Sequence, residues 1–520
     1  MTTACGRRRW LTSIALAAIA VIPAGCAADA GSTGTSTGSE TISVAYTQPL
    51  ETLDPIDSDE NQVNTIDNVL YDTLVTYNSS NELAGELATS FALTPDASQV
   101  KITLRSGVRF HDGSTLTAND VKYSFDRYVA IGQDVASELA DYKSATVIDA
   151  THLLINLKEP DSTFLANLSK LYILEEKLVT AHAGTDNGQT WLQTHDAGSG
   201  PYAVASGTVP VRLTRFAKFW GYSSARPAAL VFQQISEDST KVAELKNGQL
   251  DIALDLQTAD AKSLAGTSGI TLDWLQVPNT AYIFMNTQYG ATKSLAVREA
   301  VRLAYDYSGG FSEIRGGEGE IENGPLPQTL SCEITTPAFK QNLAEAKSIL
   351  AKAGDSHLTL TLRFQPSISD QVREATLLQS DLGSIGVPLK LVPITYPEYL
   401  SNLSHPSSIP ELTLVQDTAG TPDAGVYLDQ AYDSTAIGST NRAAYSNAAV
   451  DKLLGKAQTS VSENSQCSLY KQAETLINAD APSISMYTLW APVAYRTGVV
   501  TGVTASKIVY PMSLRDIRVK

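Results

Sequence analysis

The sequence predicts an α/β fold divided into two lobes, and three observations support this prediction. The chain has 520 residues, more than one hydrophobic core of ordinary size organises, so two or three domains are expected. Residues 239–254 combine an amphipathic helix with a short apolar strand, and helix and strand alternate again between residues 281 and 394. Because this alternation is typical of α/β domains, each stretch predicts one lobe.

The first half of the chain is predicted to hold short strands and capped helices. Thr117 is the expected N-cap of a helix with Asp120 in its first turn, where side-chain oxygens satisfy free backbone N–H groups. Gly248 is expected to end a helix over 239–249, because glycine suits the position after a helix. Residues 147–157 predict a hairpin, and further strands are expected at 41–46, 99–105, 202–206, 211–216 and 250–254.

The second half has stronger helical periodicity. Gly354 and Gly386 follow two of the periodic segments and are expected to end them. The predicted helices lie at 294–306, 341–353, 369–385, 447–458 and 464–478, and the predicted strands at 281–286, 358–364 and 389–394.

The first 25 residues have the pattern of an export signal. Arg7–Arg9 are basic and residues 11–22 are apolar, a segment too short for a membrane-spanning helix, which needs about 20 residues. The residues before Cys26 resemble a bacterial lipobox apart from Pro23, so lipidation of Cys26 is expected. The alternative is ordinary cleavage that releases a secreted protein, and the export route, general or twin-arginine, stays open. Residues 26–40 are rich in Gly, Ser and Thr and predict a flexible tether.

Two cysteines remain after the signal and the lipidation site. Cys332 and Cys467 form an even pair in an oxidising compartment, where disulfides persist. A disulfide between them is one expectation, and two separate buried thiols are the alternative.

Charge and motifs narrow the classes of function. The formal net charge is −17, which argues against nucleic acid as a partner because like charges repel over long distances. The sequence has no P-loop, GxSxG, HExxH or CxxC motif, and no GxGxxG motif that opens a helix. No catalytic residue, metal site or cofactor is therefore predicted.

A series of stretches, in order and spacing, resembles the family 5 extracellular solute-binding proteins of ABC importers, which bind dipeptides, oligopeptides or nickel. The most specific stretch is residues 86–127. The others are LDP (53–55), GSGPY (198–202), ELKNGQLDIA (244–253), MNTQYG (285–290), VREAVRLAYD (297–306), AKSILAKAG (346–354), QSDLGSIGV (379–387) and YSNAAVDKLLGKA (445–457). Together they cover nearly the whole chain after the export signal.

The resemblance implies a two-lobed, periplasmic-binding-protein-like fold with two hinge crossovers and an extra domain in the N-terminal half. Ligand is then trapped between the lobes as they close. The implied ranges are 41–75, 198–277 and 490–520 for lobe I, 76–197 for the extra domain, and 278–489 for lobe II.

The resemblance also implies site residues. A peptide ammonium in a dry cleft needs a carboxylate partner, and Asp417 matches the aspartate that serves this purpose in peptide binders of the family. The interval from Asp417 to Pro422 is one residue longer than expected, and the alternative is that Asp417 caps a loop. Tyr46, Tyr487 and Trp490 lie near the implied crossovers and could line the cleft, with core packing as the alternative for each.

One position departs from the dipeptide binders. They carry an arginine before a proline in the stretch matched here by residues 363–371, whereas this chain has Gln365 before Pro366, with Arg363 two places earlier. This leaves room for longer peptides or another solute.

The expected function is capture of short peptides for an ABC permease at the outer face of the bacterial cell membrane, by a lipid-anchored monomer that is not an enzyme. A nickel or metallophore binder is an alternative, although the six histidines show no metal-binding spacing. Two more hypotheses stay open: an oligosaccharide binder, and a sensor that presents its ligand to a membrane receptor.

Overall fold

The computed structural model describes residues 40–520 except 59, 355–357, 419, 507 and 509–511. The predicted export signal, Cys26 and nearly all of the tether lie outside the described residues. No helix in the described part of the chain is both long and apolar enough to cross a membrane.

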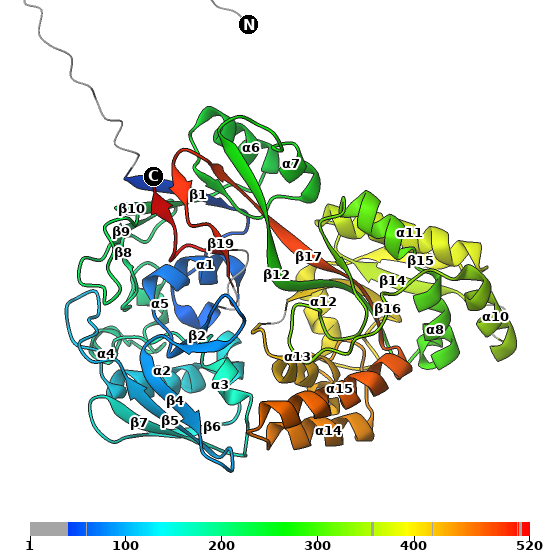
Figure 1. The fold of residues 1–520 in the computed structure, drawn as a ribbon, viewed down its shortest axis with the longest axis horizontal. Coiled ribbons are helices and arrows are strands. Elements are labelled where there is room, and N and C mark those ends of the chain that lie inside the picture. The colour runs from blue at the N-terminus through cyan, green and yellow to red at the C-terminus, as the bar shows by residue number, and fades with distance from the viewer. Residues whose placement is uncertain (1–39, 59, 355–357, 419, 507, 509–511) are drawn as a thin grey trace, which may run out of the picture. The chain divides into compact units, whose positions relative to one another are not determined.

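Eleven strands form one mixed sheet (Figure 1). Together with the helices this confirms the predicted α/β class. The strand order is β15 (Leu389–Pro393), β14 (Leu360–Phe364), β16 (Leu412–Thr418), β12 (Ile270–Met285), β17 (Ser483–Arg496), β11 (Ile252–Ala253), β1 (Thr41–Tyr46), β10 (Ala229–Gln234), β9 (Val211–Arg215) and β8 (Tyr202–Ser206), and β13 (Gly319–Ile321) pairs with β17.

Two long strands, β12 and β17, run antiparallel through the middle of this sheet and connect its two ends (Figure 1). Their register shifts between Gln276 and Thr280, a stretch that contains Pro278, which has no N–H to give to a ladder. Proline in the pattern also explains why the sequence predicted a strand only over 281–286. Beyond the shift, the buried Glu322 carboxylate accepts hydrogen bonds from the hydroxyls of Thr280 at 3.1 Å and Thr488 at 2.6 Å.

The first half of the chain adds an antiparallel sheet of four strands, in the order β4 (Ala88–Leu93), β5 (Gln99–Leu104), β7 (His152–Leu157) and β6 (Tyr142–Val147). The helix α2 (Ala118–Ile131) begins after Thr117. The predicted cap is present as a capping box, in which the side chains of Thr117 and Asp120 each accept from the backbone N–H of the other. Apolar residues from both sheets, among them Val100 and Leu230, belong to one core cluster.

The remaining elements of this half and of the C-terminal segment are short. They are η1 (Pro55–Asp57), α1 (Asn61–Leu70), β2 (Val75–Tyr77), β3 (Leu83–Gly85), η2 (Asp134–Leu139), α3 (Phe164–Asn167), α4 (Glu176–Ala181), α5 (Gln189–Leu192), α6 (Asp238–Asn247), α7 (Thr258–Lys262), β18 (Val500–Thr501), β19 (Thr504–Ala505), β20 (Met512–Ser513) and β21 (Arg518–Val519). As predicted, α6 ends at Gly248, whose φ of +80° favours glycine.

In the second half, alternate residues of β12 face two different cores. Ala281, Ile283 and Met285 belong to one apolar cluster, whereas Tyr282 and Phe284 belong to another. Successive side chains of a strand point to opposite faces, so a strand with helices over both faces is apolar throughout. The elements here are η3 (Ala291–Lys293), α8 (Leu295–Ala304), α9 (Tyr307–Gly309), η4 (Gly310–Ile314), α10 (Leu343–Ala353), α11 (Ser369–Ser384), α12 (Tyr396–Leu403), α13 (Ala424–Tyr432), η5 (Ser434–Ala436), α14 (Ala448–Gln458) and α15 (Glu463–Asp480).

Cys332 and Cys467 are joined by a disulfide, with their Cα atoms 4.8 Å apart. The bond links the loop before α10 to α15 across 135 residues of sequence. It therefore connects two segments within the second half of the chain.

Candidate ligand-binding cleft

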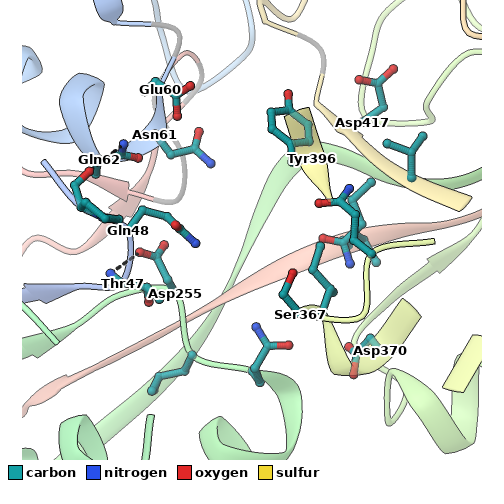
Figure 2. Close-up of a pocket in the computed structure, with 18 of the residues that line it drawn as sticks. Thr47, Gln48, Glu60, Asn61, Gln62, Asp255, Ser367, Asp370, Tyr396 and Asp417 are labelled. Carbon is teal, nitrogen blue, oxygen red and sulfur yellow. Dashed lines mark hydrogen bonds between the residues drawn. The ribbon is translucent and has the colours of Figure 1, made fainter. Parts of the chain in front are cut away.

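A cavity of about 960 Å³ lies between two groups of segments from distant parts of the chain. The lining residues from 47–63, Asp134 and 255–258 are named the N-terminal wall. Those from 365–370, 396–399 and 415–417, with Arg315 and Arg442, are named the C-terminal wall. Leu489, Trp490 and Pro492 of β17 lie between the walls. Figure 2 shows labelled side chains of the two walls on opposite sides of the cavity.

An ion pair forms the centre of the C-terminal wall. Asp417, near the end of β16, accepts a hydrogen bond from Arg442 at 2.6 Å, and their side chains are 15% and 18% exposed. Burial opposes the charge on Arg442, but the Asp417 carboxylate raises its pKa above the usual range. Arg442 also lies over the ring of Tyr399, with 5.9 Å from its Cζ to the ring centroid. Only one oxygen of Asp417 is engaged by a described side chain, so the carboxylate keeps capacity for a further cation.

Four side chains that line the cavity carry a polar atom with no hydrogen-bond partner among the described residues. A buried polar atom without a partner costs free energy, so a ligand group that reached one of these atoms would be stabilised by it. They are the Tyr399 hydroxyl, Trp490 Nε1, Arg315 Nε and Arg442 Nε. The three nitrogens are donors and the hydroxyl can donate, so together they suit a ligand that is rich in carbonyl or carboxylate oxygens.

A second ion pair of the C-terminal wall, between Arg315 and Asp370, contacts the N-terminal wall. Arg315 donates to the Asp370 carboxylate at 2.7 Å and to the Thr258 hydroxyl at 3.0 Å. Thr258 belongs to α7 and Asp370 to α11, so this contact ties the N-terminal wall to the C-terminal wall. Arg315 also donates to the backbone carbonyl of Trp490 at 3.3 Å.

The N-terminal wall is acidic. Its lining residues include five carboxylates and no arginine or lysine among those described: Glu51, Asp57, Glu60, Asp134 and Asp255. Burial, with the neighbouring Asp134 carboxyl, raises the pKa of Asp57 to about 7, and Asp54 and Glu60 add to the shift. Burial also raises the pKa of Asp255, which accepts a hydrogen bond from the Thr47 N–H at 3.2 Å and has Lys241 nearby. In Figure 2, Glu60 and Asp255 lie across the cavity from Asp417 and Asp370.

The structure places two of the four predicted ligand residues at the cavity. Asp417 and Trp490 line it. Tyr487 is fully buried in an apolar core and donates to Glu374 at 2.6 Å, and Tyr46 is 2% exposed in the core of the first half. Neither tyrosine is among the lining residues, because each belongs to a strand whose buried face contacts the core. Both therefore match the core-packing alternative.

Gln365 lines the cavity, whereas Arg363 does not. The lining residue before Pro366 is thus a neutral side chain.

The sequence did not predict Arg442, Tyr399, Arg315 or the acidic wall. Arg442 meets Asp417 across 25 residues of sequence, and no local pattern signals such a contact. None of the described histidines lines the cavity, and no group of three or more potential metal ligands occurs among the described residues.

Comparisons with known proteins agree with this architecture. A glutathione-binding protein of Pectobacterium atrosepticum is 25% identical over 498 residues, which cover 93% of each chain. A periplasmic binding protein of Helicobacter pylori, solved with the peptide STSA, superposes with a TM-score of 0.80 at 21% identity and covers 93% of this chain and 98% of its own. A Campylobacter jejuni protein solved with Ni(L-His) superposes with a TM-score of 0.78 at 19% identity, covering 92% and 99%.

These superpositions confirm the two-lobed fold class. Residues 82–439 also match the family described as "Bacterial extracellular solute-binding proteins, family 5 Middle". The predicted resemblance is thereby confirmed, and the chain belongs to the family 5 bacterial extracellular solute-binding proteins.

Proposed function

We propose that this protein captures short peptides in the cleft between the two walls and delivers them to the permease of an ABC importer. The observation that carries the proposal is the C-terminal wall, where a carboxylate with one unengaged oxygen, Asp417, lies among unpaired donors. A peptide has a terminal ammonium to pair with the carboxylate. It also has a row of carbonyl oxygens to accept from the donors of Tyr399, Arg442 and Trp490.

The size and chemistry of the cavity support the same ligand class. A volume of about 960 Å³ is at the upper end of the range of small-molecule pockets and holds several residues. Gln365, at the position where the dipeptide binders of the family carry an arginine, has no charge to pair with a ligand carboxylate. We therefore favour peptides longer than two residues, whose carboxylate is met elsewhere.

The architecture and the export pattern complete the proposal. Lobe I comprises 41–75, 198–277 and 490–520, the extra domain 76–197, and lobe II 278–489, with hinges at the register shift of β12 and β17. Cys26 carries a lipid anchor that holds the protein, as a monomer, at the outer face of the membrane. The protein performs no catalysis and needs no cofactor, as in a binding-protein family.

A panel of defined ligands tests the proposal. Thermal unfolding is followed with peptides of two to six residues, a nickel–histidine chelate and cello-oligosaccharides, and positive results are measured by isothermal titration calorimetry. A ligand at 100 times its Kd that binds only the folded protein stabilises it by about 2.7 kcal/mol. We expect peptides of three or more residues to raise the melting temperature. Stabilisation by the chelate or the sugars alone overturns the peptide assignment.

A further inference from the structure

The two walls of the cleft differ in charge. On the C-terminal wall each carboxylate has an arginine partner: Asp417 pairs with Arg442, and Asp370 pairs with Arg315. On the N-terminal wall none of the described lining residues is cationic. The ions of the C-terminal wall therefore balance one another, and those of the N-terminal wall do not.

The uncompensated charge comes from a small set of side chains. Glu51, Glu60 and Asp134 are exposed and form no ion pair with another described residue. Asp57 lies in contact with Asp134, and like charges in contact favour a bound cation or a proton between them. Asp255 is excluded from this set because Lys241 lies nearby.

The unpaired polar atoms supply independent evidence that a ligand belongs in this cavity. Tyr399 is only 2% exposed, yet it lines the cavity and its hydroxyl has no partner among the described residues. This atom belongs to the C-terminal wall, so it is separate from the acidic residues. A ligand that satisfies it brings its other face to the N-terminal wall.

We propose that the ligand carries a cationic side chain that meets Glu60, Asp57 and Asp134, so that the protein selects short peptides containing lysine or arginine. The inference rests on the proposed function and names the substrate class of the same cleft. A cleft lined by one sign of charge concentrates ions of the opposite sign. Closure of the walls removes water and strengthens the attraction, and the same carboxylates repel acidic peptides.

The test compares tripeptides that differ only at the central side chain. Ala-Lys-Ala, Ala-norleucine-Ala and Ala-Glu-Ala are titrated into the full-length protein by calorimetry at 20 mM and 500 mM NaCl. Norleucine keeps the four-carbon stem of lysine and lacks its charge. An exposed ion pair contributes up to about fivefold in affinity, so two or three such contacts give the lysine peptide an advantage of about tenfold at low salt. High salt reduces it by screening, and the glutamate peptide binds most weakly.

The double variant Glu60→Gln, Asp134→Asn tests whether the preference for the lysine peptide comes from the N-terminal wall. Both side chains are exposed, and Glu60 makes no capping hydrogen bond at the start of α1. Asp134 has a φ of +46°, which asparagine tolerates. The lysine-to-norleucine affinity ratio is expected to fall from about ten to about two. The matched control Glu159→Gln, Asp516→Asn removes the same two charges at exposed positions outside the cleft and is expected to keep the full ratio.

The outcomes separate this inference from the proposed function. If peptides bind but the norleucine peptide binds as well as the lysine peptide, the cationic preference is wrong and peptide capture stands. An equal loss of the ratio in the control variant also overturns it, because the effect then comes from net charge. If none of the tripeptides, nor longer peptides with central lysine, binds, both the inference and the peptide assignment fail.

Discussion

Replacing Asp417 by asparagine tests the role of the carboxylate in the ion pair of the C-terminal wall. The amide keeps the size of the side chain and can still accept from Arg442, which now lies 2.6 Å from the carboxylate. A hydrogen bond to a charged group contributes about 1.5–3 kcal/mol. We therefore expect peptide affinity to fall by about 10- to 150-fold.

The same substitution has a cost in stability that must be separated from the loss of binding. The pair is 15% and 18% exposed, so it lies between a surface pair of about 0–1 kcal/mol and a buried pair of about 3–5 kcal/mol. A loss of roughly 1–2 kcal/mol in the free energy of unfolding lowers the melting temperature by about 5 °C for a folding unit of roughly 200 residues, about the size of lobe II. The variant thus stays folded at 25 °C, where binding is measured.

A change in the ligand, combined with the change in the protein, gives a double-mutant cycle for the contact between Asp417 and the peptide ammonium. N-acetylation removes the peptide ammonium, so wild type should lose as much affinity for the acetylated peptide as Asp417→Asn loses for the free peptide. The variant should bind both peptides about equally, as measured by calorimetry. If the two losses add instead, Asp417 and the ammonium do not meet, and the reasoning from the unengaged oxygen of Asp417 is refuted. Arg442→Gln breaks the same pair and removes one ligand donor but keeps the carboxylate, so this variant should still bind the free peptide more tightly than the acetylated one.

Three further predictions concern stability and pH. Replacing Cys332 and Cys467 by serine opens a loop of 135 residues, which by loop entropy costs about 5 kcal/mol; calorimetry should show a transition lowered by roughly 10 °C, and an unchanged transition contradicts the bond. Burial raises the pKa of Glu374 to about 7, so its contribution to stability is present below the unfolded pKa of about 4.3 and is lost as pH rises to 7. In urea titrations, the free energy of unfolding of Glu374→Gln relative to wild type should therefore rise by up to about 3 kcal/mol between pH 5 and pH 8. A difference that stays constant with pH refutes this. The pKa of Asp57 is raised to about 7, so this carboxyl is protonated below that pH. The affinity for Ala-Lys-Ala relative to the norleucine peptide should therefore fall about threefold from pH 7.5 to pH 5.5. A ratio that does not change with pH contradicts a contact between Asp57 and the lysine side chain.

Local physics explains which elements could be predicted. The N-cap at Thr117 and the glycine stop at Gly248 depend on neighbours within one helical turn, and both match the structure. The length of β12 could not be predicted, because Pro278 interrupts its pattern and pairing with β17 sustains the strand on both sides. Apolar character alone also could not distinguish a pocket from a core: the sequence left both alternatives open for Tyr46 and Tyr487, and both are buried.

The sequence by itself determined the α/β class, the family and the position of Asp417, because periodicity, caps and ordered motifs are properties of neighbouring residues. Only the tertiary structure decided what faces that aspartate. Arg442 reaches it from a separate loop, and the acidic residues of the opposite wall come from segments up to about 200 residues apart. Charge in a cleft is a sum over space, whereas a sequence presents it along a line, so the excess of carboxylates on one wall becomes visible only when the two walls face each other.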